Sequence, residues 1–124
     1  MSKFILLAED DEDNRDLVSF ILQRSQLDVQ LIVAENGQQA IELATTKKPD
    51  LILMDLQMPV LDGWKAIPKL KADERTKDIP IIAFTAQASP ADKARALELG
   101  CSAHVSKPME AEELLTTIKQ YLNT

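Results

Sequence analysis

Short apolar segments recur along the chain, and each is followed by a stretch in which apolar residues return every three or four positions. The segments are FILLA at 4–8, VQLIVA at 29–34, LILM at 51–54, IPIIAFT at 79–85 and AHVS at 103–106. Their apolar residues run together rather than alternate with polar ones, which is typical of strands covered on both faces. The pattern therefore predicts five βα units.

The helical stretches are marked by residues typical of helix ends and by apolar faces. Asn36-Gly37 forms a turn before the second helix, Pro90 suits the first turn of the fourth, and Gly100 suits its end. Alternation of strands and helices predicts an α/β fold with a doubly wound parallel sheet, in which ligands bind beyond the carboxyl ends of the strands. The expected buried helix faces contain, in chain order, Leu17, Val18, Ile21 and Leu22; Ala40, Ile41, Leu43 and Ala44; Trp64, Ile67 and Leu70; Ala94 and Leu97; and Ala111, Leu115, Ile118 and Leu122.

Length, charge and cysteine content exclude several classes of protein. A chain of 124 residues is expected to form a single domain, 1–124. The net charge of -6 argues against direct binding to nucleic acid or to membrane surfaces, because both need basic patches. A single cysteine, the lack of a signal-peptide core and the lack of an apolar run long enough to cross a bilayer predict a cytoplasmic protein.

Polar residues gather where the predicted strands end. Because the carboxyl ends of parallel strands share one edge of the sheet, the acids there are expected to converge, and their repulsion requires a cation. Oxygen ligands without a nearby His or Cys suit Mg²⁺, which also binds phosphate oxygens. The residues after the first, third, fourth and fifth strands are, respectively, Glu9, Asp10 and Asp11; Asp55; Thr85 and Ala86; and Lys107 and Pro108.

A carboxylate at this edge can also be a nucleophile that accepts a phosphoryl group. Such a transfer needs an attacking oxygen, a metal, a further cation and a hydrogen-bond donor, and Asp55, Mg²⁺, Lys107 and Thr85 would supply these four. Each residue alone has an ordinary structural interpretation, and the acids at 11–13 are better explained as a helix N-terminus. Their joint occurrence at the strand ends favours phosphoryl transfer.

Four stretches, ILLAEDDEDNR, PDLILMDLQMPVLDG, IPIIAFTA and HVSKP, resemble the motifs of response-regulator receiver domains of two-component signalling, and the resemblance covers the full chain. Thr85 follows Asp55 by 30 residues (55 to 85) and Lys107 follows it by 52 (55 to 107), as in that family. The resemblance implies a flavodoxin-like sheet with strand order 2-1-3-4-5. It also implies that Asp55 accepts phosphate from a phosphohistidine on a sensor histidine kinase or a histidine phosphotransfer protein, and becomes 4-aspartylphosphate.

The resemblance further implies a metal site and self-catalysed chemistry. Glu9, Asp10, Asp55 and the backbone carbonyl of Gln57 are expected to bind Mg²⁺ or Mn²⁺. The domain would catalyse its own phosphorylation and dephosphorylation, and it would not be an enzyme that acts on an outside substrate. Gln57 and Gln87 would tune the rate of dephosphorylation.

A switch and its docking surfaces are implied in the same way. Thr85 and His104 are expected to move together on phosphorylation, with Lys107 paired to the phosphate, Pro108 in a cis peptide and Trp64 anchoring the third helix. No output domain is expected, so a stand-alone receiver, monomeric or dimerising on phosphorylation, would dock to a downstream protein. The expected docking face, on the fourth helix, fifth strand and fifth helix, includes Lys93, Arg95, Glu98 and Lys119, and the histidine-bearing partner would dock near Arg15, Leu17 and Val18.

Two alternatives stay open. A receiver-like binding module that switches without phosphate would share the fold, although it would not need to keep the acids, the threonine and the lysine. A haloacid-dehalogenase-like phosphatase also uses a strand-end aspartate with Mg²⁺, but it needs a second acid where this chain has Gln57. A flavin or nucleotide site is disfavoured, because Gly37, Gly63 and Gly100 form no glycine-rich loop.

Overall fold

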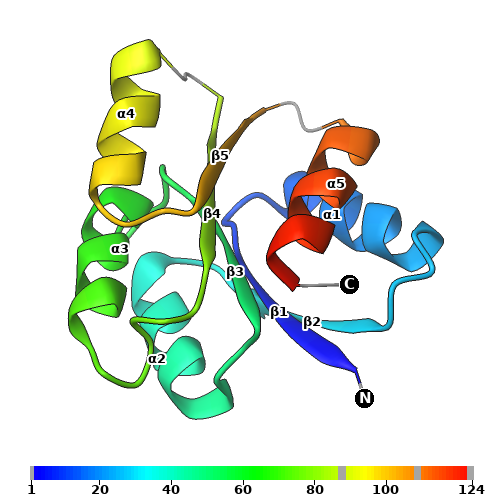
Figure 1. Cartoon of the computed structure of the whole chain (residues 1–124), viewed down its shortest axis with the longest axis horizontal. Helices are drawn as coiled ribbons and strands as arrows, with labels where there is room; N and C mark the ends of the chain where they lie inside the picture. The colour runs from blue at the N-terminus through cyan, green and yellow to red at the C-terminus, as the bar shows by residue number, and fades with distance from the viewer. Residues whose placement is uncertain (1, 87–88, 108–109, 123–124) are drawn as a thin grey trace.

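The computed structural model describes residues 2–86, 89–107 and 110–122. All five strands are parallel and lie in the order β2-β1-β3-β4-β5, which confirms the predicted doubly wound, flavodoxin-like sheet (Figure 1). The elements, in chain order, are β1 (Lys3–Ala8), α1 (Glu12–Arg24), β2 (Val29–Ala34), α2 (Gly37–Lys47), β3 (Leu51–Asp55), α3 (Gly63–Ala72), β4 (Ile81–Thr85), α4 (Pro90–Glu98), β5 (Ala103–Ser106) and α5 (Ala111–Leu122).

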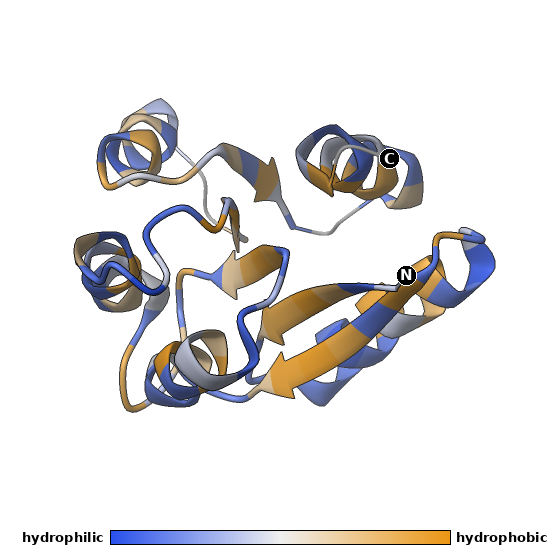
Figure 2. Ribbon diagram, turned by 60° about the horizontal axis from the view of Figure 1, so that its bottom comes forward, coloured by the Kyte–Doolittle hydropathy of each residue, from blue (hydrophilic) through white to orange (hydrophobic). Residues whose placement is uncertain are grey.

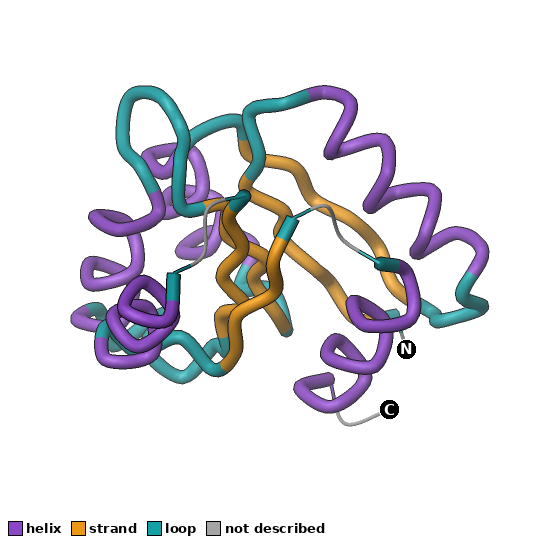
Figure 3. Tube along the Cα trace, turned by 90° about the horizontal axis from the view of Figure 1, so that it is seen from above, coloured by secondary structure: helices purple, strands orange, loops and turns teal. Residues whose placement is uncertain are grey.

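Helices cover both faces of the sheet, as Figure 3 shows from above. Leu6 and Ala8 of β1 pack with buried residues of α2, α3 and α4, whereas Ile5 and Leu7 pack with buried residues of α1 and α5. The strands are accordingly the most continuously hydrophobic elements in Figure 2, while the helices are hydrophobic on one side only. Within the described part of the chain, no helix combines the length and the apolar character needed to cross a bilayer.

Side-chain caps start the helices close behind the strands. Asp11 accepts a hydrogen bond from the backbone N–H of Asp13, Asn36 from that of Gln39, Asp62 from that of Lys65 and Ser89 from that of Asp92. Each cap satisfies a backbone donor that has no partner within its helix. The cap at Asp11 confirms that the acids at 11–13 form a helix N-terminus.

The predicted buried face of α4 is wrong. Ala94 is exposed and Leu97 is 51% exposed, while Ala96 is the buried residue of this helix. The guanidinium of Arg95 lies 4.3 Å from the ring centre of Trp64, a half-buried residue packed against the core. Trp64 therefore joins α3 to α4, which supports its expected role as an anchor for α3.

Two further predicted core positions are also wrong. Ala111 is exposed, and Leu114, one turn later, takes its place in the core of α5 beside Ile118. Leu17 is 36% exposed, because α1 turns the face containing Val18 toward the sheet. The other predicted residues of both helix faces are buried or half-buried, so the error is confined to one residue in each helix.

Two strand boundaries differ from the prediction. β4 begins at Ile81 rather than Ile79, because the N–H of Ile79 donates to the carbonyl of Thr76 in the preceding turn. Asp55 was expected just after β3, but it is the last residue of that strand and is in register with Phe84 of β4. The regular backbone of the strand therefore fixes the position of Asp55.

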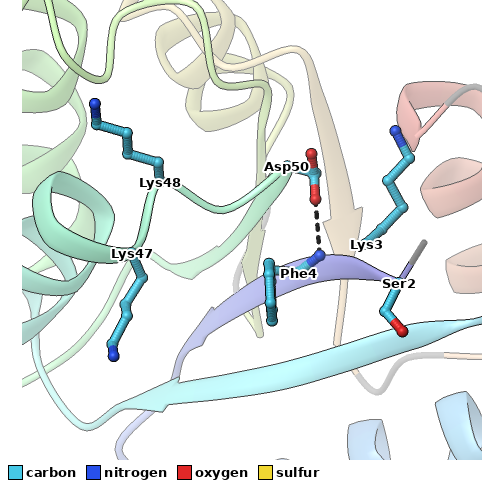
Figure 4. A pocket seen from close by; sticks show the side chains of 6 residues that line it. All are labelled: Ser2, Lys3, Phe4, Lys47, Lys48 and Asp50. Atoms are coloured by element: carbon cyan, nitrogen blue, oxygen red, sulfur yellow. Dashed lines mark hydrogen bonds between the residues drawn. The ribbon is translucent and has the colours of Figure 1, made fainter.

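The amino edge of the sheet has a shallow hollow of about 370 Å³ beside Ser2, Lys3, Phe4, Lys47, Lys48 and Asp50. The carboxylate of Asp50 accepts a hydrogen bond of 2.8 Å from the N–H of Phe4. Figure 4 shows that the three lysine side chains point in different directions around the hollow. The charges at this edge do not converge on a common point.

Candidate functional site

The candidate site lies at the opposite, carboxyl edge of the sheet, around Asp55. Asp55 is 3% exposed, and its Oδ1 accepts a hydrogen bond of 3.0 Å from the backbone N–H of Gln57. Its Oδ2 lies 2.8 Å from Nζ of Lys107, which comes from the segment after β5. The carboxylate is thus buried and held from two sides.

Lys107 joins two carboxylates that are far apart in the sequence. Its Nζ donates to Oε1 of Glu9 at 2.6 Å as well as to Asp55, and the Lys107 side chain is only 15% exposed. The backbone N–H of Lys107 donates to the carbonyl of Thr85 at 3.0 Å, which fixes the start of this segment against the end of β4. The ammonium group is therefore positioned by both its backbone and its two partners.

The acids around this ammonium group leave an excess of negative charge. Carboxylate oxygens of Glu9, Asp10 and Asp55 lie within 4.8 Å of one another, and Glu9 and Asp55 are buried. Burial and the nearby Asp55 raise the pKa of Glu9 to about 7, despite the opposing effect of Lys107. A hard divalent cation fits this donor set, since its oxygens carry more charge than one lysine neutralises.

The pKa of Lys107 moves in the direction expected for a shared ammonium group. Burial alone would lower the pKa of Lys107, but hydrogen bonds to Asp55 and Glu9 raise it above its usual value. The ammonium form is therefore favoured at neutral pH, which keeps one positive charge between the two carboxylates.

Gly63, the first residue of α3, lies directly against the backbone of the candidate site. A Cβ at this position would lie 2.4 Å from the carbonyl oxygen of Asp55 and 2.8 Å from Cα of Leu56. The N–H of Gly63 also donates to the carbonyl of Leu56 at 3.1 Å. The Asp62-Gly63 turn thus has a specific reason for its glycine: α3 begins in contact with the segment that carries Asp55.

Thr85 and His104 occupy the two strands on the far side of Asp55. Thr85 is 3% exposed at the end of β4, and His104 lies in β5 in register with Ala83. Both ring nitrogens of His104 are buried, and neither has a hydrogen-bond partner among the described residues. Burial, and then Lys93, lower the pKa of His104 below its usual value, so the neutral imidazole is favoured.

The structure brings together most of the predicted site. Glu9, Asp10, Asp55 and Lys107 converge, and Thr85 ends the neighbouring strand at the same edge. The predictions made for Gln87 and Pro108 lie outside the described residues.

One residue near the site was expected only on a docking surface. Nη1 of Arg15 donates to the backbone carbonyls of both Glu9 and Asp10, each at 3.0 Å. The only signal in the sequence is a basic residue that follows Glu9 by six positions and Asp10 by five. Spacing alone does not reveal which way the two carbonyls point.

Comparisons with known proteins agree with this geometry. A family model described as the response regulator receiver domain matches residues 5–119. The polar-differentiation response regulator DivK of Brucella anthropi is 38% identical over 98% of each chain. The receiver domain of the sensor histidine kinase PA1611 from Pseudomonas aeruginosa, solved with a magnesium ion coordinated in its active-site cleft, is 31% identical over the whole of both chains, with a TM-score of 0.89.

A second similar structure contains a partner protein. The receiver domain of the response regulator Ssk1 from Saccharomyces cerevisiae was solved with the histidine phosphotransfer protein Ypd1; it is 28% identical, with a TM-score of 0.85 over 97% of this chain and 88% of that one. Since the family match spans nearly the whole fold and includes the strand ends that form the site, the chain belongs to the receiver domains of response regulators in two-component signalling.

Proposed function

We propose that Asp55 is the phosphoacceptor of this receiver domain, and that Glu9, Asp10, Thr85 and Lys107 assist the transfer. The observation that carries the proposal is the single ammonium group of Lys107, which lies 2.8 Å from Asp55 and 2.6 Å from Glu9 in a buried acidic cluster. Such an arrangement has no evident folding benefit, because burying charged groups costs free energy. It is well suited to a reaction that brings additional negative charge to the same point.

The reaction is a displacement at phosphorus. An Oδ atom of Asp55 forms a bond to the phosphorus of a phosphohistidine while the bond between phosphorus and the imidazole nitrogen breaks, and the electron pair leaves with the imidazole. Lys107 stabilises the charge on the transferring group, and the hydroxyl of Thr85 donates a hydrogen bond to a phosphoryl oxygen. Because the acceptor is its own side chain, the domain acts on itself rather than on an outside substrate.

A divalent cation, Mg²⁺ or Mn²⁺, fits the donor set. Glu9, Asp10, Asp55 and the backbone carbonyl of Gln57 would hold it, and all four are oxygen donors. When bound, the ion neutralises charge on the phosphoryl oxygens. The 4.8 Å cluster of carboxylate oxygens supports this assignment for the three acids. Gln57 follows Asp55 by two residues, and Gln87 follows Thr85 by two residues. We assign both glutamines the control of water access during dephosphorylation.

The output of the reaction is a change of protein partners. Thr85 and His104 would form the switch, because a phosphoryl group on Asp55 attracts the hydroxyl of Thr85 and opens room beside β5. A sensor histidine kinase or a histidine phosphotransfer protein would supply phosphate, as the pairing of Ypd1 with the related receiver Ssk1 suggests. The surface of α4, β5 and α5 would then bind a downstream protein.

Acetyl phosphate with Mg²⁺, followed by intact-mass measurement, tests the proposal. We expect one phosphoryl group on the wild-type protein and none on the Asp55→Asn variant. Asp50→Asn, at the amino edge of the sheet, is the matched control and should be phosphorylated like the wild type. An unmodified wild type, or equal modification of Asp55→Asn, would contradict the proposal and favour a module that switches without phosphate.

A further inference from the structure

Arg15 binds the backbone of Glu9 and Asp10 in the loop between β1 and α1. Its Nη1 atom donates to the carbonyl oxygens of Glu9 and Asp10, both at 3.0 Å. The Arg15 side chain is 19% exposed, and its Nη2 lies 3.8 Å from Oε1 of Glu35, in the segment between β2 and α2. A mostly buried arginine side chain thus joins three segments: the β1–α1 loop, the first turn of α1, and the loop between β2 and α2.

The carbonyls that Arg15 binds belong to residues that leave the sheet. The N–H of Glu9 still follows the strand and donates to the carbonyl of Ala34 at 2.9 Å. The strand pairing of β1 ends at Ala8. The carbonyl groups of Glu9 and Asp10 both accept hydrogen bonds from Nη1 of Arg15 instead. Because the backbone is fixed on one side by Arg15, the side chains of Glu9 and Asp10 have fewer directions available to them.

We propose that Arg15 is a positioning residue for the divalent cation, acting through the backbone of Glu9 and Asp10 rather than by contact with the ion. This inference rests on the metal site proposed above. Residues that orient metal ligands without touching the ion typically change metal affinity by about 10-fold to 100-fold when they are replaced.

A positive charge near a cation site also has an opposing effect, since it repels the ion. If charge alone mattered, Arg15→Met would bind metal more tightly than the wild type and Arg15→Lys would bind it equally. If positioning dominates, Arg15→Met binds metal more weakly, and Arg15→Lys is intermediate because one ammonium group replaces a planar donor that also lies near Glu35. The two variants therefore separate the two effects.

Direct Mn²⁺ binding, followed by the loss of the free-ion signal in electron paramagnetic resonance, measures the affinity without any reaction. We expect Arg15→Met to raise the dissociation constant roughly 10-fold and Arg15→Lys a few-fold, in line with other residues of this kind. Arg24→Met is the matched control, because Arg24 is an exposed arginine at the end of the same helix, where its guanidinium lies over Phe20. Its affinity should equal that of the wild type.

A second measurement separates positioning from a merely structural role. At saturating Mg²⁺ the initial rate of phosphorylation of Arg15→Met by acetyl phosphate should return close to the wild-type rate, because the nucleophile itself is intact. Urea unfolding shows whether each variant is folded under the assay conditions, and Arg15→Lys alone decides the question if Arg15→Met does not fold.

Several outcomes overturn the inference. Equal or tighter Mn²⁺ binding by folded Arg15→Met would show that the guanidinium does not position the ligands, as would unchanged affinity in Arg15→Lys when that variant alone is folded. Asp10→Asn provides the separate test of the site: if it binds Mn²⁺ as tightly as the wild type, the metal site itself is misassigned and the role of Arg15 falls with it.

Discussion

Both edges of the sheet carry lysines and carboxylates, but these groups are arranged differently at the two edges. At the carboxyl edge, Lys107 bridges Asp55 and Glu9 in a site where both acids are buried. At the amino edge, lysines surround the exposed Asp50, but they point apart and Asp50 binds a backbone N–H instead. Composition alone therefore does not bring charged groups together, since only the carboxyl edge combines convergence with burial.

Burial matters because it decides how strongly charges interact. Two charges 4 Å apart interact by about 1 kcal/mol in water and by several-fold more in a partly buried setting. Charges at the amino edge are solvated and can be changed singly at little cost, whereas those at the carboxyl edge depend on one another. The following predictions test this difference, beginning with the largest expected effect.

Lys107→Met should have the largest effect on stability. Removing the ammonium group leaves two buried carboxylates without their shared partner, and breaking a buried pair costs about 3–5 kcal/mol. We expect a loss of that size in the free energy of unfolding at pH 7 without metal, measured by urea denaturation. Lys47→Met at the amino edge should stay within about 0.5 kcal/mol of the wild type, and an equal loss in both would remove the distinction between the edges.

The pH dependence of stability should report on Glu9. Its pKa is raised from 4.5 to about 7 in the fold, so the stabilisation is complete below pH 4.5 and is lost as the pH rises through about 7. At about 1.4 kcal/mol per pH unit, the loss is at most about 3 kcal/mol. Urea unfolding of the metal-free protein at pH 5 and pH 8 measures it, and Glu9→Gln should lack it.

His104 acts in the opposite sense over part of that range. Its pKa lies below 6.5 in the fold, so the stabilisation from its neutral form is complete above pH 6.5 and declines as the pH falls below that value. His104→Phe should therefore make the wild-type decline between pH 5 and pH 8 steeper. An unchanged slope in this variant would show that the buried imidazole does not titrate differently in the folded and unfolded chains.

Gly63→Ala should disturb both stability and phosphorylation. The added Cβ meets backbone atoms of Asp55 and Leu56, and overpacking of this kind costs about 1–3 kcal/mol. Gly100→Ala is the comparison at the other edge: its φ of +115° predicts strain, but its nearest obstacle is the flexible side chain of Lys71. Urea unfolding and acetyl phosphate labelling should show that both variants lose stability and only Gly63→Ala is labelled more slowly.

Asp50→Ala should have only a small effect on stability and none on phosphorylation. It removes the acceptor for the N–H of Phe4, and a single hydrogen bond of this type contributes about 0.5–1.5 kcal/mol. The rate of phosphorylation by acetyl phosphate should equal that of the wild type. A slower rate would mean that the amino edge is coupled to the site, contrary to the comparison of the two edges.

The sequence was most informative where the pattern is local and unambiguous. Continuous apolar runs located all five strands, and the acids, threonine and lysine at their ends located the candidate site, because parallel strands bring their carboxyl ends to one edge. It was least informative for α4, where Leu97 fits a helical stripe but remains exposed. Apolar residues occur on more than one side of this helix, so their spacing does not show that the side with Ala96 faces the core.

The finer geometry of the site depends on contacts that spacing does not encode. Arg15 was expected on a docking surface, yet its guanidinium binds two backbone carbonyls whose direction depends on how the chain leaves β1. Likewise, the sequence suggested that Lys107 meets a phosphate, but it did not show that the ammonium group already joins Glu9 to Asp55. Both features depend on the backbone path after a strand.

The small number of buried residues in α4 has a consequence for local opening of the domain. This helix buries Ala96 and contacts α3 through Arg95 and Trp64, whereas α3 buries Gly63, Ala66, Ile67 and Leu70. Segments with few buried contacts open locally at a lower free energy than the core. Backbone amides of α4 should therefore exchange with deuterium through local opening, well before those of β3, so this helix can open while the strand that carries Asp55 stays paired.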